Sequence, residues 1–252
     1  MDVKGLLKAA DVAEAATLRR APNGVAWAQI GETQLVEADL ERLVQAVPSK
    51  LAAALAAKAY YFVPLALAEA RGDGHRGGSE ETLVSPAYTA ELGDEAICHR
   101  NVALPGGVEG VFISARLLND RFALSFEFFI NVAHAFVESA GVPAEFGDLA
   151  WAQAIGEIRG ETSQDAWESR AAALTDRSRV DEKAKLEFLE ASFSDAIAIY
   201  LLSLAVDFDY SELREREYPL LAAPALADRL KLVAKLFPPN EGYEFSIRYR
   251  RR

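Results

Sequence analysis

The chain has 252 residues, of which 51% are hydrophobic and 26% charged, and its formal net charge is −11. This length and composition predict a folded globular protein with a substantial core. The acidic balance argues against a general nucleic-acid-binding surface, and no apolar run is long and uninterrupted enough for a membrane span. Because Cys98 is the single cysteine, no intrachain disulfide can form, which fits a cytoplasmic protein.

The first part of the sequence predicts helices around a short hairpin. Its expected elements are, in order, a helix over 2–20, two hairpin strands over 25–30 and 33–36, a helix over 37–47 and an alanine-rich helix over 51–70. A glycine-rich loop over 71–79 then favours a boundary near residue 78. We therefore expect an N-terminal region over 1–78 and a second domain over 79–252, with one continuous domain as the alternative.

The second part predicts a small sheet followed by helices. The expected elements are strands over 82–84, 96–102 and 108–115, a helix over 126–140 and a long helix over 182–205. Thr162 to Asp165 and Ser178 to Asp181 match capping boxes with Asp in place of Glu, and the second opens the long helix. The predicted fold class is α+β, predominantly helical, with a small mixed or antiparallel sheet.

The helix over 126–140 is apolar except for one narrow polar stripe, and Gly141 suits the left-handed position that ends it. The residues of the stripe are Glu127, Asn131, His134 and Glu138. Because His134 and Glu138 are four residues apart, they can place two donor atoms on one metal ion. The alternative is that the stripe is the solvated face of an amphipathic helix.

The helix over 182–205 contains a lone charge in an apolar setting. Its C-terminal half is apolar on nearly every side, with Asp195 as the only charged residue, which is typical of a helix at the centre of a fold. A buried carboxylate costs several kcal/mol unless it is paired, hydrogen-bonded or bound to a metal. We therefore expect Asp195 to have a partner, and to lie close enough to His134 for one ion or one water to bridge them.

These features resemble a zincin-type metallopeptidase of the glutamate-ligand branch, over roughly residues 96–205. In that family the helix motif His-Glu-x-x-His supplies two zinc ligands and the general base, and an acidic residue on a later helix is the third ligand. Here residues 134–138 read His-Ala-Phe-Val-Glu. The resemblance implies a zincin-like core in which His134 is the first metal ligand, Glu138 replaces the second and Asp195 lies in place of the third.

Ala135 occupies the position of the catalytic glutamate, so nothing on this helix can take a proton from a metal-bound water in the family's manner. The resemblance therefore implies a protein that has lost peptidase activity and acts as a binding or regulatory domain for a protein or peptide partner. It implies either no cofactor or a divalent metal, with zinc and manganese as candidates. A set of two carboxylates and one imidazole would select zinc less sharply than two imidazoles do.

Two other functions remain open. One is a metal-dependent hydrolase with this non-standard His/Glu/Asp ligand set, in which Glu127 or Glu157 supplies the base. The other is a non-enzymatic helical scaffold. If no metal is bound, the alternative is that the three predicted ligands form a buried, hydrogen-bonded structural cluster.

Other chemically capable residues favour structural roles. Cys98 and His99 are adjacent on a predicted strand and so point to opposite faces, which favours a buried thiol over a catalytic pair. Glu157 and Glu161 are interpreted as part of a solvated face, and His75 as a solvated loop residue.

Overall fold

The computed structural model describes residues 5–30, 37–68, 81–85, 98–115, 117, 120–176, 179–210 and 218–247. The helices in these ranges are α1 (Ala9–Ala15), α2 (Glu37–Gln45), α3 (Ser49–Ala52), α4 (Arg121–Ala140), α5 (Ala144–Ile155), α6 (Gln164–Ala173), α7 (Glu182–Ala205) and α8 (Ala223–Leu236), with 3-10 turns η1 (Ala53–Leu55) and η3 (Pro105–Gly107). The strands are β1 (Leu7–Lys8), β2 (Arg19–Arg20), β3 (Ala26–Gln29), β4 (Lys58–Val63), β5 (Leu65–Ala68), β6 (Glu81–Val84), β7 (Cys98–Leu104) and β8 (Val108–Ser114).

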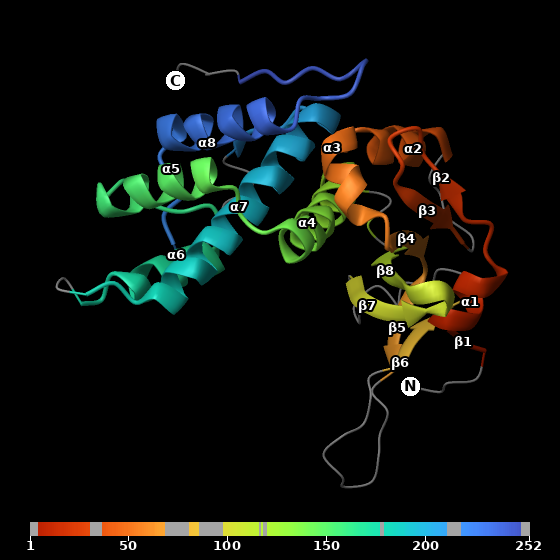
Figure 1. The fold of residues 1–252 in the computed structure, drawn as a ribbon. Coiled ribbons are helices and arrows are strands. Elements are labelled where there is room, and N and C mark those ends of the chain that lie inside the picture. The colour runs from red at the N-terminus through yellow and green to blue at the C-terminus, as the bar shows by residue number, and fades with distance from the viewer. Residues whose placement is uncertain are drawn as a thin grey trace, which may run out of the picture.

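The strands form one mixed sheet and one small antiparallel sheet. The mixed sheet has the order β2-β3-β4-β8-β7, in which β3, β4 and β8 run parallel and the edge strands β2 and β7 pair antiparallel. The small sheet has the order β1-β6-β5. Figure 1 shows the strands on one side of the molecule and α5 to α8 on the other, with α4 between them. The predicted α+β class, mainly helical with a small mixed sheet, is confirmed.

The prediction of a helix over 51–70 is wrong beyond its first turn. Helix α3 and η1 end at Leu55, and β4 begins at Lys58. The alanines before residue 58 favour a helix, but β4 contains Tyr60 to Val63, a run of aromatic and β-branched residues that suits a strand. This run is buried throughout, as expected for a central strand covered on both faces.

Alternate residues of β4 point into two separate cores. Tyr60 and Phe62 join the large cluster with α4 and α7, whereas Tyr61 and Val63 join a smaller cluster with α1 on the opposite face. The helix predicted over 2–20 is thus limited to α1, because residues 19–20 form the edge strand β2 instead.

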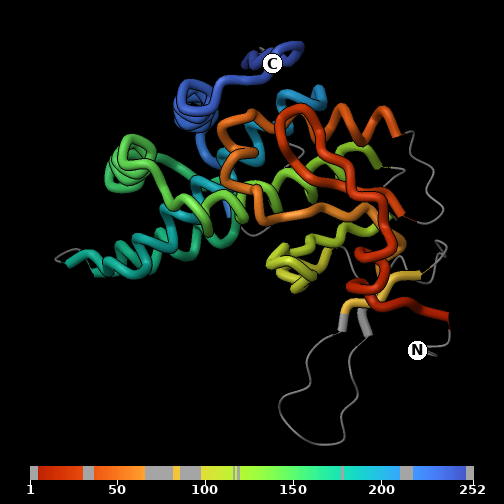
Figure 2. The backbone as a smooth tube through the Cα atoms, turned by 45° about the vertical axis from the view of Figure 1, so that its right-hand side comes forward, coloured from red at the N-terminus to blue at the C-terminus, as the bar shows by residue number. Residues whose placement is uncertain are grey.

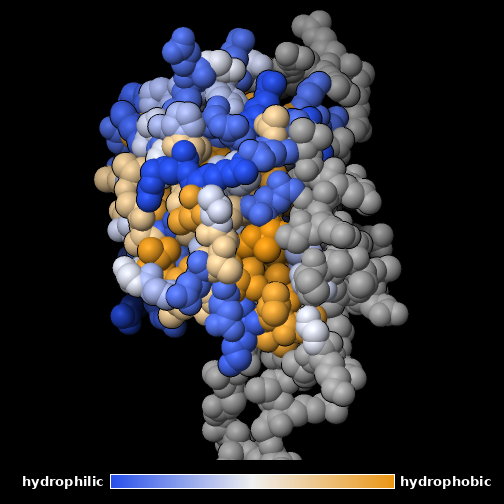
Figure 3. Space-filling model, turned by 90° about the vertical axis from the view of Figure 1, so that its right-hand side faces the viewer, coloured by the Kyte–Doolittle hydropathy of each residue, from blue (hydrophilic) through white to orange (hydrophobic). Residues whose placement is uncertain are grey.

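On the side of the molecule that carries β2 and α1, hydrophobic residues gather below a mainly hydrophilic area (Figure 3).

The sheet joins the two predicted regions of the chain. β4 lies before the predicted boundary at residue 78 and β8 after it, and the two strands pair from Lys58–Glu109 to Val63–Ser114. The division of the chain into one or two domains stays a prediction. The glycine-rich loop over 71–79, with His75, and the predicted hairpin turn at residues 31–32 lie outside the described residues.

Helix α4 connects the sheet to the helical half of the molecule. The Asp120 carboxylate accepts a hydrogen bond from the Ala123 amide at its start, and Gly141, with a φ of 71°, ends it as predicted. Phe128 is fully buried, with its ring 5.1 Å from the ring of Tyr60 in β4. Farther along the helix, Phe136 meets Phe193 of α7 with ring centres 6.3 Å apart.

Helix α7 is the central helix, and α4, α6 and α8 pack against it (Figure 2). By length and composition it alone among the described helices could cross a membrane, but 67% of its most apolar window is buried inside the fold. That burial is typical of the core helix of a globular protein. Its N-terminal cap is Asp181, which accepts hydrogen bonds from the amides of residues 183 and 184, whereas the predicted cap Ser178 lies outside the described residues.

Candidate functional site

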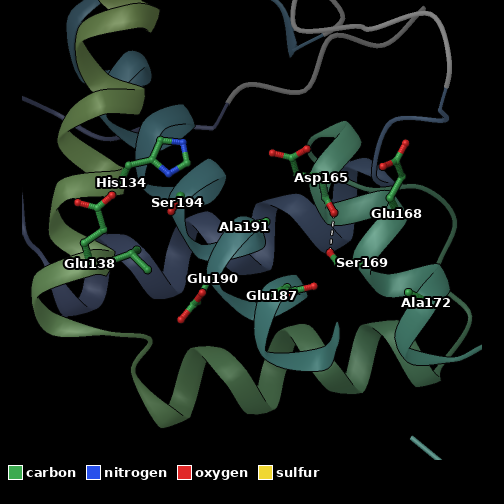
Figure 4. A pocket seen from close by; sticks show the side chains of 11 residues that line it. His134, Glu138, Asp165, Glu168, Ser169, Ala172, Glu187, Glu190, Ala191 and Ser194 are labelled. Carbon is green, nitrogen blue, oxygen red and sulfur yellow. Dashed lines mark hydrogen bonds between the residues drawn. The ribbon is translucent and has the colours of Figure 1, made fainter. Parts of the chain in front are cut away.

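A cavity of about 680 Å³ lies between α4, α6 and α7 (Figure 4). Its described lining residues are His134, Val137 and Glu138 from α4, Asp165, Glu168, Ser169 and Ala172 from α6, and Glu187, Glu190, Ala191 and Ser194 from α7. A volume of this size is within the range of small-molecule sites. Because three helices contribute, the cavity depends on their packing rather than on any one segment.

The cavity wall is acidic. Five of the lining residues are Asp or Glu, and none of the described ones is Lys or Arg. Two of the carboxylates have cationic neighbours outside the wall. Glu138 Oε2 lies 3.8 Å from Lys58 Nζ, and Glu187 Oε1 lies 3.5 Å from Lys183 Nζ. Within the described part of the chain, Asp165 and Glu190 have no ion-pair partner, so negative charge remains on the wall.

His134 is half-buried at one end of the cavity. Burial lowers the pKa of its imidazole, and the nearby Arg100 lowers it further. Glu138 and Asp165 act in the opposite direction, but the net pKa lies below the ordinary value. The imidazole is therefore predominantly neutral at pH 7 and presents a hydrogen-bond acceptor as well as a donor.

Asp165 reaches the same end of the cavity from α6. Figure 4 shows its carboxylate directed toward the His134 ring. Its position follows from the start of α6, where the Ser163 hydroxyl accepts a hydrogen bond from the Ala166 amide. The sequence placed this cap one residue too early, at Thr162, because both residues are suitable caps.

Ser194 provides a neutral acceptor on the α7 side. It is only 1% exposed, yet it lines the cavity. Glu187, Glu190 and Ser194 lie on one face of α7 because they are spaced at i, i+3 and i+7. Asp195 is rotated by about 100° from Ser194 and is not among the described lining residues.

Asp195 has the partner that its sequence context predicted, but this partner is a pair of hydroxyls. The Thr162 hydroxyl donates to Asp195 Oδ2 at 2.7 Å, and Ser163 forms a second hydrogen bond. Burial of the carboxyl raises its pKa from the ordinary value of 3.8 to about 6, against the opposing effects of these hydrogen bonds and of Arg229. Asp165, which faces His134, is also close enough to raise the pKa of Asp195.

A buried ionic cluster lies beside Asp195 and corrects the interpretation of Glu161 as solvated. Glu161 is fully buried, with its carboxylate 2.9 Å from Arg170 and 3.0 Å from Arg229. Arg229, itself fully buried, also donates to Gln153 Oε1 at 2.7 Å. The cluster holds α5, α6 and α8 together, which the spacing of the two glutamates could not reveal. Glu157 is exposed, as predicted.

The other end of the α4 stripe is occupied by structural contacts. Asn131 is buried, donates to Glu127 Oε1 at 2.8 Å, and accepts from the Cys98 thiol at 3.5 Å. Burial is the main reason why the pKa of Cys98 is raised to about 12, which makes it a poor nucleophile. His99 instead contacts Thr82. The stripe as a whole is therefore not a solvated face.

The structure brings two of the three predicted metal ligands to the cavity and places the third elsewhere. His134 and Glu138 line the wall, whereas Asp195 is held by Thr162 and Ser163. No three His, Cys, Asp or Glu side chains of the described ranges are grouped so that they could hold one metal ion. The ligand roles of these three residues stay a prediction.

Sequence reasoning missed the residues that make the cavity acidic. These are Asp165, Glu168, Glu187 and Glu190, together with the hydroxyl of Ser194. The spacing of the α7 residues was a usable signal, but nothing in the sequence indicated that α6 packs beside them.

A search against protein-family models, curated proteins and solved structures finds no match to this chain.

Proposed function

We propose that the protein is a zincin-like domain without the peptidase centre, and that it acts as a binding or regulatory domain through the cavity beside His134. The observation that carries this proposal is the composition of the cavity wall. It joins one imidazole to five carboxylates, whereas the position after His134, where the family has its catalytic glutamate, is Ala135 and lies outside the wall. The wall therefore has groups that bind a ligand and lacks the family's general base.

The burial of Ala135 supports the proposal. This residue is 5% exposed and packs in the main core. A methyl group there contributes to packing and offers no proton acceptor.

The proposed location is the cytoplasm. The reason is that the chain has a single cysteine, which cannot form an intrachain disulfide.

The metal-dependent hydrolase is the competing function, and it requires a base from another residue. Of the two candidates, Glu127 is engaged with Asn131 and Glu157 lies beyond the end of α5. Neither is among the described residues that line the cavity. The scaffold alternative requires no ligand at all, so the binding of a ligand in the cavity would exclude it.

A hydrolysis assay tests the loss of peptidase activity. Purified protein is incubated with casein and with an unstructured peptide, with and without added zinc, and compared with His134→Ala. We expect no metal-dependent cleavage above background from either protein, because Ala135 replaces the family's general base. Robust cleavage that a chelator and His134→Ala both abolish would establish the hydrolase instead.

A further inference from the structure

The segment that follows α8 lies on the surface and joins no helix or strand of the described chain. Residues 238–247, called the arm below, begin with two prolines, and Figure 1 shows them running past α3 on the outside of the molecule. Proline cannot continue a helix, so the two prolines separate the arm from α8. No residue of the arm is buried. The arm therefore packs on the molecule from outside and is not part of its interior.

Side chains hold the arm in place. The Asn240 amide nitrogen donates to two carbonyl oxygens at and just beyond the end of α2, each at 2.8 Å, and its oxygen accepts from the Ser49 amide at 3.0 Å. The Tyr243 hydroxyl donates to the Arg42 carbonyl at 2.6 Å. In the described part of the chain, the arm has one backbone–backbone hydrogen bond, which joins two of its own residues. The arm thus supplies the partners that the last carbonyl groups of α2 lack within the helix.

Alternate side chains of the arm face the body of the protein. Tyr243, Phe245 and Ile247 pack against the main core, whereas the residues between them are exposed. The centre of the Phe245 ring lies 5.2 Å from that of Tyr200 in α7, in an edge-on arrangement. Such alternation is typical of an extended peptide that lies in a groove.

The arm does not fill the space beside the end of α7. A cavity of about 320 Å³ lies there, and its described lining consists of residues 203–208 and of Glu244 and Ser246 from the arm. Asp207 and Glu244 both line this cavity, and the C-terminal end of a helix carries partial negative charge. Glu244 therefore faces charge of its own sign, whereas a lysine at this position would be attracted.

We propose that the groove under the arm is a docking site for an extended segment of a partner protein, and that the arm occupies this groove when the partner is absent. The partner segment has the pattern of the arm, with an asparagine followed three and five positions later by aromatic residues. Between the aromatic residues it has a lysine in place of Glu244. Exchange is possible because a peripheral segment opens at a lower free energy than the core. The groove is separate from the cavity beside His134, so the inference goes beyond the proposed function.

Fluorescence anisotropy tests the inference with labelled peptides that copy residues 238–247. One peptide has the natural sequence, a second carries Glu244→Lys and a third carries Asn240→Ala. Each is titrated with the parent chain and with the full-length variant Tyr243→Ala/Phe245→Ala, in which the arm is weakened. A tethered arm competes at an effective concentration on the order of millimolar, so the parent should bind the natural peptide at least about tenfold more weakly than the variant does.

The two substituted peptides test the expected pattern. The Glu244→Lys peptide should bind about threefold more tightly than the natural one, and the Asn240→Ala peptide at least about tenfold more weakly. Glu241→Gln in the full chain is the matched control, because this arm residue is exposed, and it should bind the peptides as the parent does. Circular dichroism confirms the fold of each variant. The inference is wrong if the folded double variant binds no peptide, or if the natural and Asn240→Ala peptides bind equally.

Size-exclusion chromatography separates a partner protein from a second copy of this chain. We expect the parent to be a monomer. A parent dimer that Asn240→Ala in the full chain converts to a monomer would show that the groove takes the arm of a second copy, which would overturn the proposal of a partner segment.

Hydrogen exchange of the parent keeps the inference testable if the double variant does not fold. The Ser49 amide donates to Asn240 Oδ1, so it is protected while the arm is in place. Its protection should be at least about a hundredfold below that of the amide of Ile197, a buried residue of α7, because the arm opens without global unfolding. Equal protection of the two amides would show that the arm is an integral part of the fold. These results do not bear on the hydrolysis assay, so the two proposals fail separately.

Discussion

The charge on Asp195 at neutral pH should destabilise the native protein, and Asp195→Asn should remove that cost. Burial raises the pKa of this carboxyl from 3.8 to about 6. Since one pKa unit corresponds to about 1.4 kcal/mol, ionisation at pH 7 costs the native state about 3 kcal/mol relative to the unfolded chain. Asparagine is uncharged and can still accept the hydrogen bond from the Thr162 hydroxyl.

The direction of the pH dependence follows from proton binding. Between the unfolded pKa of 3.8 and the native value of about 6, the native state binds the Asp195 proton more tightly than the unfolded chain does. The contribution of this group to stability is therefore fully present below about pH 4, and it is lost as the pH rises through about 6. The asparagine variant has no ionisable group at position 195, so its stability should not show this pH dependence.

Urea unfolding of both proteins between pH 4 and pH 8 measures the effect. Because asparagine accepts a weaker hydrogen bond than a carboxylate, we expect the variant to be more stable than the parent by about 1–3 kcal/mol at pH 7.5, with the difference disappearing near pH 4. Asp148→Asn, which alters an exposed carboxylate on α5, serves as the control and should show neither effect. A variant that is less stable at pH 7.5, with a pH profile parallel to that of the parent, would refute the reasoning.

Two further stability predictions concern buried polar groups, and urea unfolding at pH 7 measures both. The Tyr60 hydroxyl is buried without a partner among the described residues, whereas the Tyr200 hydroxyl donates to a backbone carbonyl at 2.7 Å. Tyr60→Phe should therefore be neutral or stabilising and Tyr200→Phe should cost about 1–3 kcal/mol; equal losses would contradict this reasoning. Arg229→Met should lower the free energy of unfolding by about 3–5 kcal/mol, because it removes one of the two arginines that form ion pairs with the buried Glu161. A decrease of less than about 1 kcal/mol would show that the Arg229–Glu161 ion pair is not needed for stability.

The helices that frame the site could be predicted because their signals are local. Helix α4 has an apolar surface with a single polar stripe, and Gly141 fixes its end. The apolar half of α7 likewise indicated a central helix and a carboxylate, Asp195, that needs a partner. Strand β4 could not be predicted in the same way, because the alanines before it have high helix propensity and its pairing with β3 and β8 is non-local.

The composition of the cavity depends on tertiary packing, which the sequence alone did not specify. Asp165 faces His134 only because α6 packs along α7, and the two residues are 31 positions apart. The orientation of Asp195 could not be predicted either, because it depends on hydrogen bonds from Thr162 and Ser163 that the sequence did not indicate. Had Ser194 and not Asp195 been taken as the residue facing α4, helical spacing would have placed Glu187 and Glu190 on the wall, but not the acidic residues of α6.

The most direct test of the central proposal, that the His134 site does not hold a catalytic metal, is the melting temperature of the protein in the presence of zinc. A metal that binds only the native state would add about 2.7 kcal/mol at a hundredfold excess over its Kd, which raises the melting temperature by about 5–10 °C for a chain of this size. We predict that zinc and manganese leave the melting temperature unchanged in the parent and in His134→Ala alike. A rise of this size in the parent that both His134→Ala and Asp195→Asn abolish would contradict the claim and establish a metal site.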